Sequence, residues 1–211
     1  MTALAHEAPE DTMPGPDRDE YLWQTWKAME LPEGLHAEII EGALEVSPTG
    51  RHRHSKTSRE FRRELGKFLE AQSSDYITDN DMNVIQGFEV VIPDAYVAPE
   101  DDEEFITEDG LGLDARCVAL VLEVVSPGWD GTQRDRVRKR RLSARMGIPT
   151  YVIIDDYDRD GIVTVLTSPS PEDANYATST RMSYGTEVTI PEGPAKGFVI
   201  GEAITGPPRN A

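Results

Sequence analysis

Two acidic residues of the sequence stand among residues that are otherwise apolar. Glu123 lies within the apolar run 120–125, where an unpaired buried carboxylate would be costly. Asp94 follows Pro93 at the end of a second apolar segment, 88–92, and proline ends the strand hydrogen bonding there. If the two strands are neighbours, the carboxylates form an oxygen-rich site that suits Mg²⁺ or Mn²⁺. Alternatively, Glu123 emerges into solvent at a strand end or pairs with an arginine.

Lys139 is a third candidate for the same site. A helical wheel of residues 134–146 places Asp135, Lys139, Leu142 and Met146 on one stripe. Because Leu142 and Met146 need burial, Lys139 is expected to face the sheet. The alternative is an Asp135–Lys139 pair one turn apart on a solvated helix.

These three side chains predict metal-assisted hydrolysis of a phosphodiester. Asp94 and Glu123 would hold the ion, which polarises the phosphate and lowers the pKa of a bound water. Lys139 would orient that water or stabilise the charge that builds on the phosphate. We therefore assign Asp94, Glu123 and Lys139 as catalytic residues, with the two acids as metal ligands.

The charge distribution indicates how a nucleic acid would be bound. The formal net charge is −18, which opposes general affinity for a polyanion. Fourteen of the 21 lysines and arginines, however, fall in two segments, 51–67 and 134–145. Both segments are expected to face the phosphate backbone, and the second carries an arginine stripe that includes Arg134, Arg138 and Arg141. The alternative is that these arginines pair with the acidic surface.

His54 begins the basic helix expected over residues 54–71. At a helix N-terminus it would contact a phosphate or substrate. The structural alternative is a capping or packing role. No histidine has a partner at a spacing that predicts a zinc site.

Hydrophobic periodicity predicts the first half of the fold. A short helix is expected over 21–29, with Trp23 and Trp26 as core anchors. Two strands should flank a turn at Glu41-Gly42. After the helix at 54–71, strands are expected at 82–85, 88–92 and 94–97, followed by an acidic surface loop over 101–109.

The second half of the chain predicts a parallel crossover. The nearly continuous apolar run 117–125 is typical of a central strand covered on both faces. The helix 134–146 and a buried strand at 151–155 follow, which implies a parallel strand–helix–strand unit. Residues 162–167, 176–182 and 187–190 resemble an antiparallel hairpin extension.

Length and composition predict one domain. A chain of 211 residues suits a single core, expected over 20–205, with a disordered leader at 1–19 and a loose tail at 206–211. The single cysteine, Cys117, excludes disulfide scaffolding and a cysteine-rich zinc site, and it is expected to be buried. No segment has the length of a membrane span or the pattern of a signal peptide, so a cytoplasmic location is expected.

With these residues in place, the chain resembles the PD-(D/E)XK nuclease superfamily and, within it, the restriction-endonuclease domain family called Uma. The resemblance spans residues 35–155 and consists of short motifs whose order and spacing are specific. These are EIIEG (38–42), SP (47–48), His54, PD (93–94), LEVVSP (122–127), DR (135–136) with Lys139, and GIPTY (147–151).

The resemblance implies an α/β fold with a restriction-endonuclease-like core, in which a mixed β-sheet is flanked by helices and extended by antiparallel strands. In the superfamily pattern the catalytic lysine lies two residues beyond the acid, where this chain has Val125. The family supplies it from the following helix, and Lys139 is the matching residue. Glu38 matches an additional N-terminal acid, as a metal ligand or a residue behind one, and Glu41 is the alternative.

The expected function is that of a divalent-metal-dependent endonuclease that acts on DNA. The alternative from another class is a catalytically inactive nuclease fold that serves as a scaffold for binding protein or nucleic acid. Cutting both strands of a duplex is simplest with two copies of a single site, so a homodimer is also expected.

Overall fold

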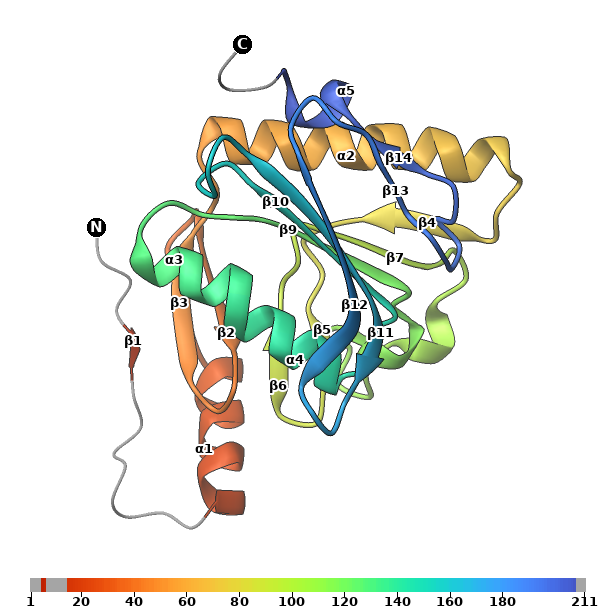
Figure 1. Ribbon diagram of the computed structural model, residues 1–211. Helices are drawn as coiled ribbons and strands as arrows, with labels where there is room; N and C mark the ends of the chain where they lie inside the picture. The colour runs from red at the N-terminus through yellow and green to blue at the C-terminus, as the bar shows by residue number, and fades with distance from the viewer. Residues whose placement is uncertain (1–4, 7–14, 208–211) are drawn as a thin grey trace.

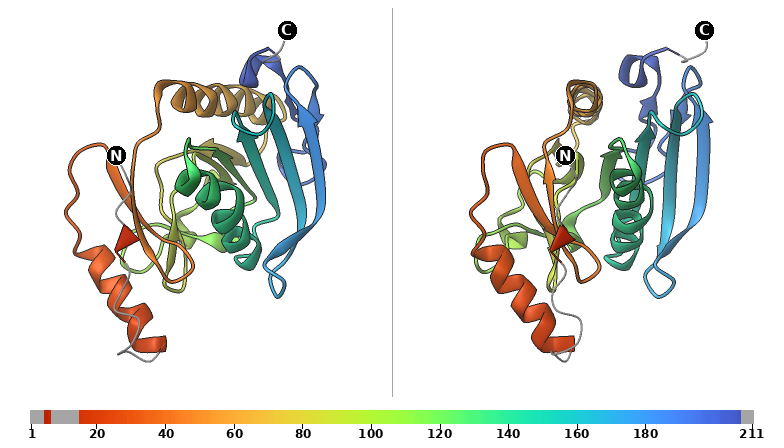
Figure 2. Two further views of the ribbon diagram at one scale, coloured as in Figure 1. Left: turned by 60° about the vertical axis from the view of Figure 1, so that its left-hand side comes forward. Right: turned by 90° about the vertical axis from the view of Figure 1, so that its left-hand side faces the viewer.

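The computed structural model describes residues 5–6 and 15–207. Two six-stranded sheets form the body of the molecule, and the long helix α2 (His52–Ala71) runs across one side of it (Figure 1). In both views of Figure 2 the green helix α4 (Lys139–Arg145) lies between the orange strands of one sheet and the blue strands of the other. The candidate residues on this helix are therefore close to both sheets.

The first sheet carries the N-terminal strands. Its order is β1-β3-β2-β6-β5-β8, and all its pairs are antiparallel except β5–β8. The strands are β1 (Ala5–His6), β2 (Leu35–Ile39), β3 (Leu44–Pro48), β5 (Val84–Gln86), β6 (Glu89–Val91) and β8 (Leu113–Asp114). The β2–β3 hairpin turns at Glu41 and Gly42, both with positive φ, as the sequence predicts.

The second sheet is mixed. Its order is β12-β11-β10-β9-β7-β4, with β9 and β10 parallel and the other neighbours antiparallel. The strands are β4 (Tyr76–Asp79), β7 (Ala95–Pro99), β9 (Leu120–Val124), β10 (Thr150–Asp155), β11 (Ile162–Ser170) and β12 (Asn175–Ser183). The predicted parallel crossover and antiparallel hairpin are both confirmed.

The remaining elements are short, apart from α1. They are α1 (Gly15–Lys27), α3 (Trp129–Gln133), the π-helical η3 (Arg134–Arg138), α5 (Glu202–Thr205), the 3₁₀ helices η1 (Glu103–Phe105) and η2 (Ala115–Cys117), and the paired strands β13 (Val188–Thr189) and β14 (Val199–Ile200). Elements α3, η3 and α4 follow one another without a break.

Strand β9 is covered on both faces, as expected for a central strand. Leu120, Leu122 and Val124 belong to a core cluster that includes α2. Side chains alternate along a strand, so Glu123 shares the opposite face with Val121 and Val125, which belong to the cluster around α4. This alternation directs Glu123 toward α4 and away from α2.

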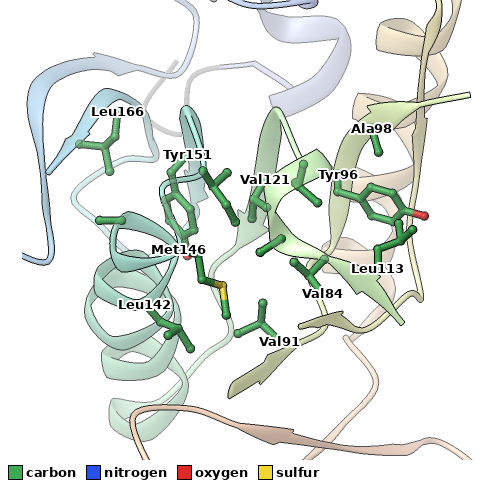
Figure 3. Close-up of a cluster of buried hydrophobic side chains, with 14 of the residues drawn as sticks. Val84, Val91, Tyr96, Ala98, Leu113, Val121, Leu142, Met146, Tyr151 and Leu166 are labelled. Atoms are coloured by element: carbon green, nitrogen blue, oxygen red, sulfur yellow. The ribbon is translucent and has the colours of Figure 1, made fainter. Parts of the chain in front are cut away.

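The core on that face fixes the orientation of α4. Leu142 and Met146 lie on the side of α4 that faces Tyr151 of β10 and Val91 of β6 (Figure 3). Asp135 and Lys139, predicted on the same stripe, are 1% and 3% exposed. The inward orientation of Lys139 is confirmed, because the apolar residues of its stripe are buried.

Some boundaries differ from the prediction. Helix α1 begins at Gly15, within the stretch expected to be a leader, while residues 1–4, 7–14 and 208–211 lie outside the described part of the chain. Its Trp23 and Trp26 stack with ring centroids 5.2 Å apart and pack against the core, as expected. Strand β4 was not predicted, and 188–189 pairs with β14 instead of extending the β11–β12 hairpin.

Cys117 is buried, as predicted, although it lies in η2 before the central strand begins. Among the described residues, no helix combines the length and apolar character needed to cross a bilayer.

Candidate functional site

The pairing of β7 with β9 brings the two predicted acids together. In this antiparallel pair Ala95 lies opposite Leu122, so the next position places Asp94 beside Glu123. The backbone N–H of Val124 donates to Asp94 Oδ2 at 2.7 Å. The Ser58 hydroxyl of α2 donates to the Asp94 carbonyl oxygen, also at 2.7 Å. Strand register and these two hydrogen bonds fix Asp94.

Lys139 lies between two glutamates. Its Nζ is 2.8 Å from Glu38 Oε1 and 3.0 Å from Glu123 Oε1. It also donates to the carbonyl oxygen of Ile92 at 3.1 Å. An ammonium group has three N–H donors, and these three acceptors match them. Lys139 therefore links the first sheet, β9 and the segment that carries Asp94.

Glu38 faces Lys139 from behind. Its side chain is fully buried, and Oε1 accepts the Ile92 N–H at 2.7 Å. Its other oxygen, Oε2, is buried without a hydrogen-bond partner. The family resemblance leaves two roles open for Glu38, a metal ligand or a residue behind one. This position supports the second role, in which Glu38 acts through Lys139. Glu41 is at the hairpin turn, bound to arginines.

Burial sets the protonation of this group. Burial raises the pKa of Glu123 well above its ordinary value, and the attraction of Lys139 only partly opposes that effect. For Lys139, burial alone would lower the pKa, but the charges of Glu123 and Glu38 raise it above the ordinary value. Lys139 is therefore charged, and Glu123 binds a proton more tightly than an exposed glutamate does.

A cavity of about 470 Å³ opens in front of these acids. Its walls come from the ends of β2 and β3, one face of α2, the segment before β7, the end of β9 and the helix that contains η3. Asp94, Glu123 and Lys139 all line it, whereas Glu38 and Glu41 do not. The three predicted catalytic residues thus share one solvent-connected space.

His54 lies beside Asp94 in the same cavity. Its Nε2 is 3.1 Å from Asp94 Oδ2. Burial alone would lower the pKa of His54, but the hydrogen bond and charge of Asp94 outweigh it and raise the pKa. A Cβ on Gly50 would lie 2.2 Å from His54 Nδ1, so only glycine leaves room for the ring in this position.

The helix that follows β9 closes another wall. Asp135 is buried, and its Oδ2 accepts the Ser126 N–H at 2.8 Å. Arg134 Nε donates to Asp135 Oδ1 at 2.8 Å and its terminal nitrogen to Ser126 Oγ at 3.3 Å. The Tyr151 hydroxyl donates to the Asp135 carbonyl oxygen at 3.1 Å. These bonds hold η3 against the end of β9.

The predicted phosphate contacts separate into two groups. Arg134 and His54 line the cavity. Arg138 and Arg141 do not; they bind acids at the β2–β3 hairpin. Arg138 pairs with Glu45 and donates to the Ile40 carbonyl oxygen at 2.5 Å, and Arg141 Nε is 2.8 Å from Glu41 Oε1. The arrangement matches the alternative in which arginines pair with the acidic surface.

The donor set determines which metal the site could accept. Within the described residues, no group of three or more histidine, cysteine or acidic side chains is close enough to enclose an ion. Asp94 and Glu123 instead offer two carboxylates beside an open cavity. Mg²⁺ commonly binds through one or two carboxylates and retains several waters, so these residues fit it. Glu38 is fully buried, does not line the cavity and has Lys139 at its Oε1, so it lies behind these two carboxylates and not beside them.

Comparison with known proteins supports the family resemblance. The family model Uma2, described as "Putative restriction endonuclease", matches residues 23–201. The chain belongs to this family. A search of curated proteins gives no match. Among solved structures, the crystal structure of "a putative nuclease belonging to DUF820" from Anabaena variabilis is similar, with a TM-score of 0.64 and 16% identity. The match covers 87% of this chain and 96% of that one.

The structural match shows a common fold, in agreement with the predicted α/β class. The Uma2 match extends beyond the 35–155 region that carries the motifs, through the β11–β12 hairpin to residue 201. The antiparallel extension is therefore part of what the family model covers.

Several cavity residues were not singled out from the sequence, among them Gly50, Ser58 and Arg62, although Arg62 lies in the basic segment 51–67. Ser58 and Arg62 share one face of α2 four residues apart, so polar residues on the cavity-facing stripe were a usable signal. For Gly50 the only signal was a glycine directly before the basic helix. Its contact with His54 depends on how the chain enters α2.

Proposed function

We propose that this protein is a divalent-metal-dependent endonuclease that hydrolyses DNA phosphodiester bonds. The observation that carries the proposal is the pair Asp94 and Glu123, adjacent in the β7–β9 register and exposed to one cavity, with the buried Lys139 bound to Glu123. Membership in a family described as restriction endonucleases supports the same reaction class.

The residues of the site would divide the work as follows. Asp94 and Glu123 would hold Mg²⁺ or Mn²⁺, which supplies the charge that polarises a phosphate and lowers the pKa of a bound water. Val124, Ser58 and His54 keep Asp94 in one place. Positioning of this kind lowers the barrier because the reacting groups need no reorganisation.

Lys139 contributes charge at the wall of the cavity. Its ammonium is held by Glu38, Glu123 and the Ile92 carbonyl, so it cannot swing freely toward solvent. A fixed positive charge at this wall would stabilise negative charge that develops on a nearby phosphate. Glu38 would act as a positioning residue that keeps Lys139 in place.

The test is cleavage of supercoiled plasmid DNA in Mg²⁺ or Mn²⁺. Asp94→Asn and Glu123→Gln should abolish nicking, and a chelator should do the same to the unchanged protein. Asp109→Asn, which removes an acid from the exposed loop 101–109, is the matched control and should cut normally. Equal nicking by all three variants would refute the assignment.

One observation supports the second candidate, an inactive scaffold. All three donors of Lys139 are taken up by protein acceptors, an arrangement that also serves to stabilise a fold. Calorimetric titration with Mg²⁺ and Mn²⁺ separates the candidates: a scaffold would bind neither ion, or would bind it equally after Asp94→Asn, whereas the enzyme would lose binding in that variant.

A further inference from the structure

Arg62 differs from the other cations of the cavity. Three lysine and arginine side chains line it: Lys139, Arg134 and Arg62. Lys139 is bound by two glutamates and Arg134 by Asp135. Arg62 makes no hydrogen bond or ion pair with any described residue, and its Nε is shielded from solvent without a partner. Among the lysines and arginines that line the cavity, Arg62 is thus the one without an acid partner in the described part of the chain.

Arg62 lies on the same face of α2 as Ser58, the residue that contacts Asp94. Ser55, Ser58 and Arg62 line the cavity from one face of α2, at the three- and four-residue spacing of a helical stripe. Ser58 binds the carbonyl of Asp94. Arg62 is four residues further along, about 6 Å at the helical rise of 1.5 Å per residue. This distance of about 6 Å along the helix is comparable to the separation of successive phosphates along a nucleic acid strand.

We propose that Arg62 binds the phosphate next to the one that is cleaved, so that the substrate is a polynucleotide strand and not an isolated phosphodiester. The inference rests on the proposed nuclease function and specifies its substrate class. The planar guanidinium can donate two parallel hydrogen bonds to a phosphate. No acid among the described residues pairs with Arg62, so its guanidinium is available to a phosphate.

The neighbours of Arg62 suit a strand that leaves the acids in this direction. Asn80 and Asp81, from the turn between β4 and β5, line the cavity with it. The Asn80 amide offers further donors. Asp81, in contrast, would repel a phosphate that came close to it. The strand would thus run along α2, from Asp94 toward Arg62.

The chain offers a matched control for the experiment. Arg59 lies on the same helix and is exposed, makes no ion pair with a described residue, and does not line the cavity. Arg62→Gln and Arg59→Gln change the net charge equally, so any difference between them reports position. Arg62→Lys keeps the charge but not the fork of donors.

The experiment compares two substrates in Mn²⁺. One is a single-stranded 12-mer oligonucleotide; the other is thymidine 5′-(p-nitrophenyl phosphate), which has one phosphodiester. Arg62→Gln should raise KM for the 12-mer about tenfold and reduce the slope of log KM against log salt by about one. It should leave kcat/KM for the single diester unchanged. Arg62→Lys should restore part of the loss, and Arg59→Gln should match the unchanged protein.

Equal effects of Arg62→Gln on both substrates, or equal effects of Arg62→Gln and Arg59→Gln on the 12-mer, would overturn the inference. Binding of the fluorescein-labelled 12-mer in Ca²⁺, followed by anisotropy, tests it without cleavage. Affinity lost in Arg62→Gln but retained in Arg59→Gln supports the phosphate contact even if the unchanged protein cuts nothing. Equal affinity of these two variants contradicts the phosphate contact whether or not cleavage occurs.

Discussion

The helix after β9 carries two groups of cations that bind acids in different surroundings. The inner group is Lys139 with Glu38 and Glu123, nearly inaccessible to solvent and at the wall of the cavity. The outer group is Arg138, Arg141 and Arg145, which bind Glu41 and Glu45 at the β2–β3 hairpin. Both groups connect the same helix to the same hairpin.

The difference between them shows that charge pairing alone does not identify a functional site. The outer arginines are 28–44% exposed in their side chains and the cavity does not reach them. Ion pairs of that kind contribute little to stability, about 0–1 kcal/mol each. The inner lysine is buried and touches a residue that faces open space. Burial together with a cavity is the reason we propose the inner group, and not the outer one, as functional.

Replacing Lys139 should produce the largest effect. Lys139→Met leaves Glu38 and Glu123 buried without their cation, and breaking a buried pair typically costs about 3–5 kcal/mol. We expect that loss in the free energy of unfolding at pH 7, measured by urea denaturation. Arg141→Met is the control from the outer group and should cost about 1 kcal/mol or less. Similar losses in both variants would remove the distinction between the groups.

Replacing Gly50 should damage the inner site without touching a charge. In Gly50→Ala the new Cβ would meet the His54 ring, which must then move away from Asp94. A displacement of about 1 Å near a catalytic group can cost about 100-fold in rate, and we expect a loss of that order in plasmid nicking. Gly66→Ala, whose Cβ would lie 3.7 Å from Thr78 Cγ2, should leave nicking unchanged. Full activity of Gly50→Ala would show that His54 does not position Asp94.

Replacing Glu41 tests the outer group as a structural clamp. Glu41 accepts from Arg141 at 2.8 Å and lies 3.1 Å from Arg145. Glu41→Gln should lower the free energy of unfolding by about 1 kcal/mol, as expected for partly exposed pairs. DNA nicking should remain within about twofold of the unchanged protein. If activity fell as far as in Asp94→Asn, the ion pairs of Glu41 with the outer arginines would belong to the functional site.

Glu89 should give the smallest effect, visible as a pH dependence. Its carboxylate accepts the backbone N–H groups of Glu41 and Gly42 at 2.8 and 3.1 Å. Burial raises its pKa to about 6 despite these bonds. Because its pKa is higher in the folded state than in the unfolded state, protonated Glu89 favours the folded state. This contribution of Glu89 to stability is fully present below the unfolded pKa near 4.5 and is lost as the pH rises through about 6.

The measurement is the difference in Tm between the unchanged protein and Glu89→Gln from pH 4 to 7.5. The Tm of the unchanged protein should fall relative to that of Glu89→Gln as the pH rises from 4.5 to 6. Glu104→Gln, at an exposed glutamate, should show a flat difference over the same range. A flat difference for Glu89→Gln as well would show that the hairpin turn does not titrate in this window.

The inner group could be predicted largely from the sequence because its signals are local. The alternation along β9 and the periodicity of 134–146 place Glu123 and Lys139 on facing sides, and both patterns are read over a few residues. The inward orientation of Lys139 followed from the burial that Leu142 and Met146 require. The strand expected at 94–97 is β7, which begins at Ala95 and pairs with β9. The segment 88–92, at whose end the sequence places Asp94, instead contributes β6 to the first sheet and is not a neighbour of β9.

The outer group could not be predicted, because its pairs join residues about 93–100 positions apart. A helical wheel shows that Arg138 and Arg141 point away from Lys139. It does not show which acidic residue lies close to them in the folded chain. The choice between Glu38 and Glu41 likewise depends on how the hairpin packs against this helix, which the local pattern does not contain. The contact of His54 with Asp94 depends on how α2 packs beside the start of β7, which is also a long-range feature.

The π-helical turn at Arg134–Arg138 has a consequence for alignment. A π turn holds one residue more than an α turn, and each residue of an α-helix advances the side-chain direction by about 100°. Deleting one residue from this turn would convert it to a regular α turn and leave Lys139 facing Glu123, because the extra residue is accommodated within the turn. Relatives that lack this residue would therefore direct a lysine into the cavity from a position one residue nearer to β9 in the sequence. Equivalent lysines should be sought by the direction of their side chains on the helix, and not by the number of residues that separate them from β9.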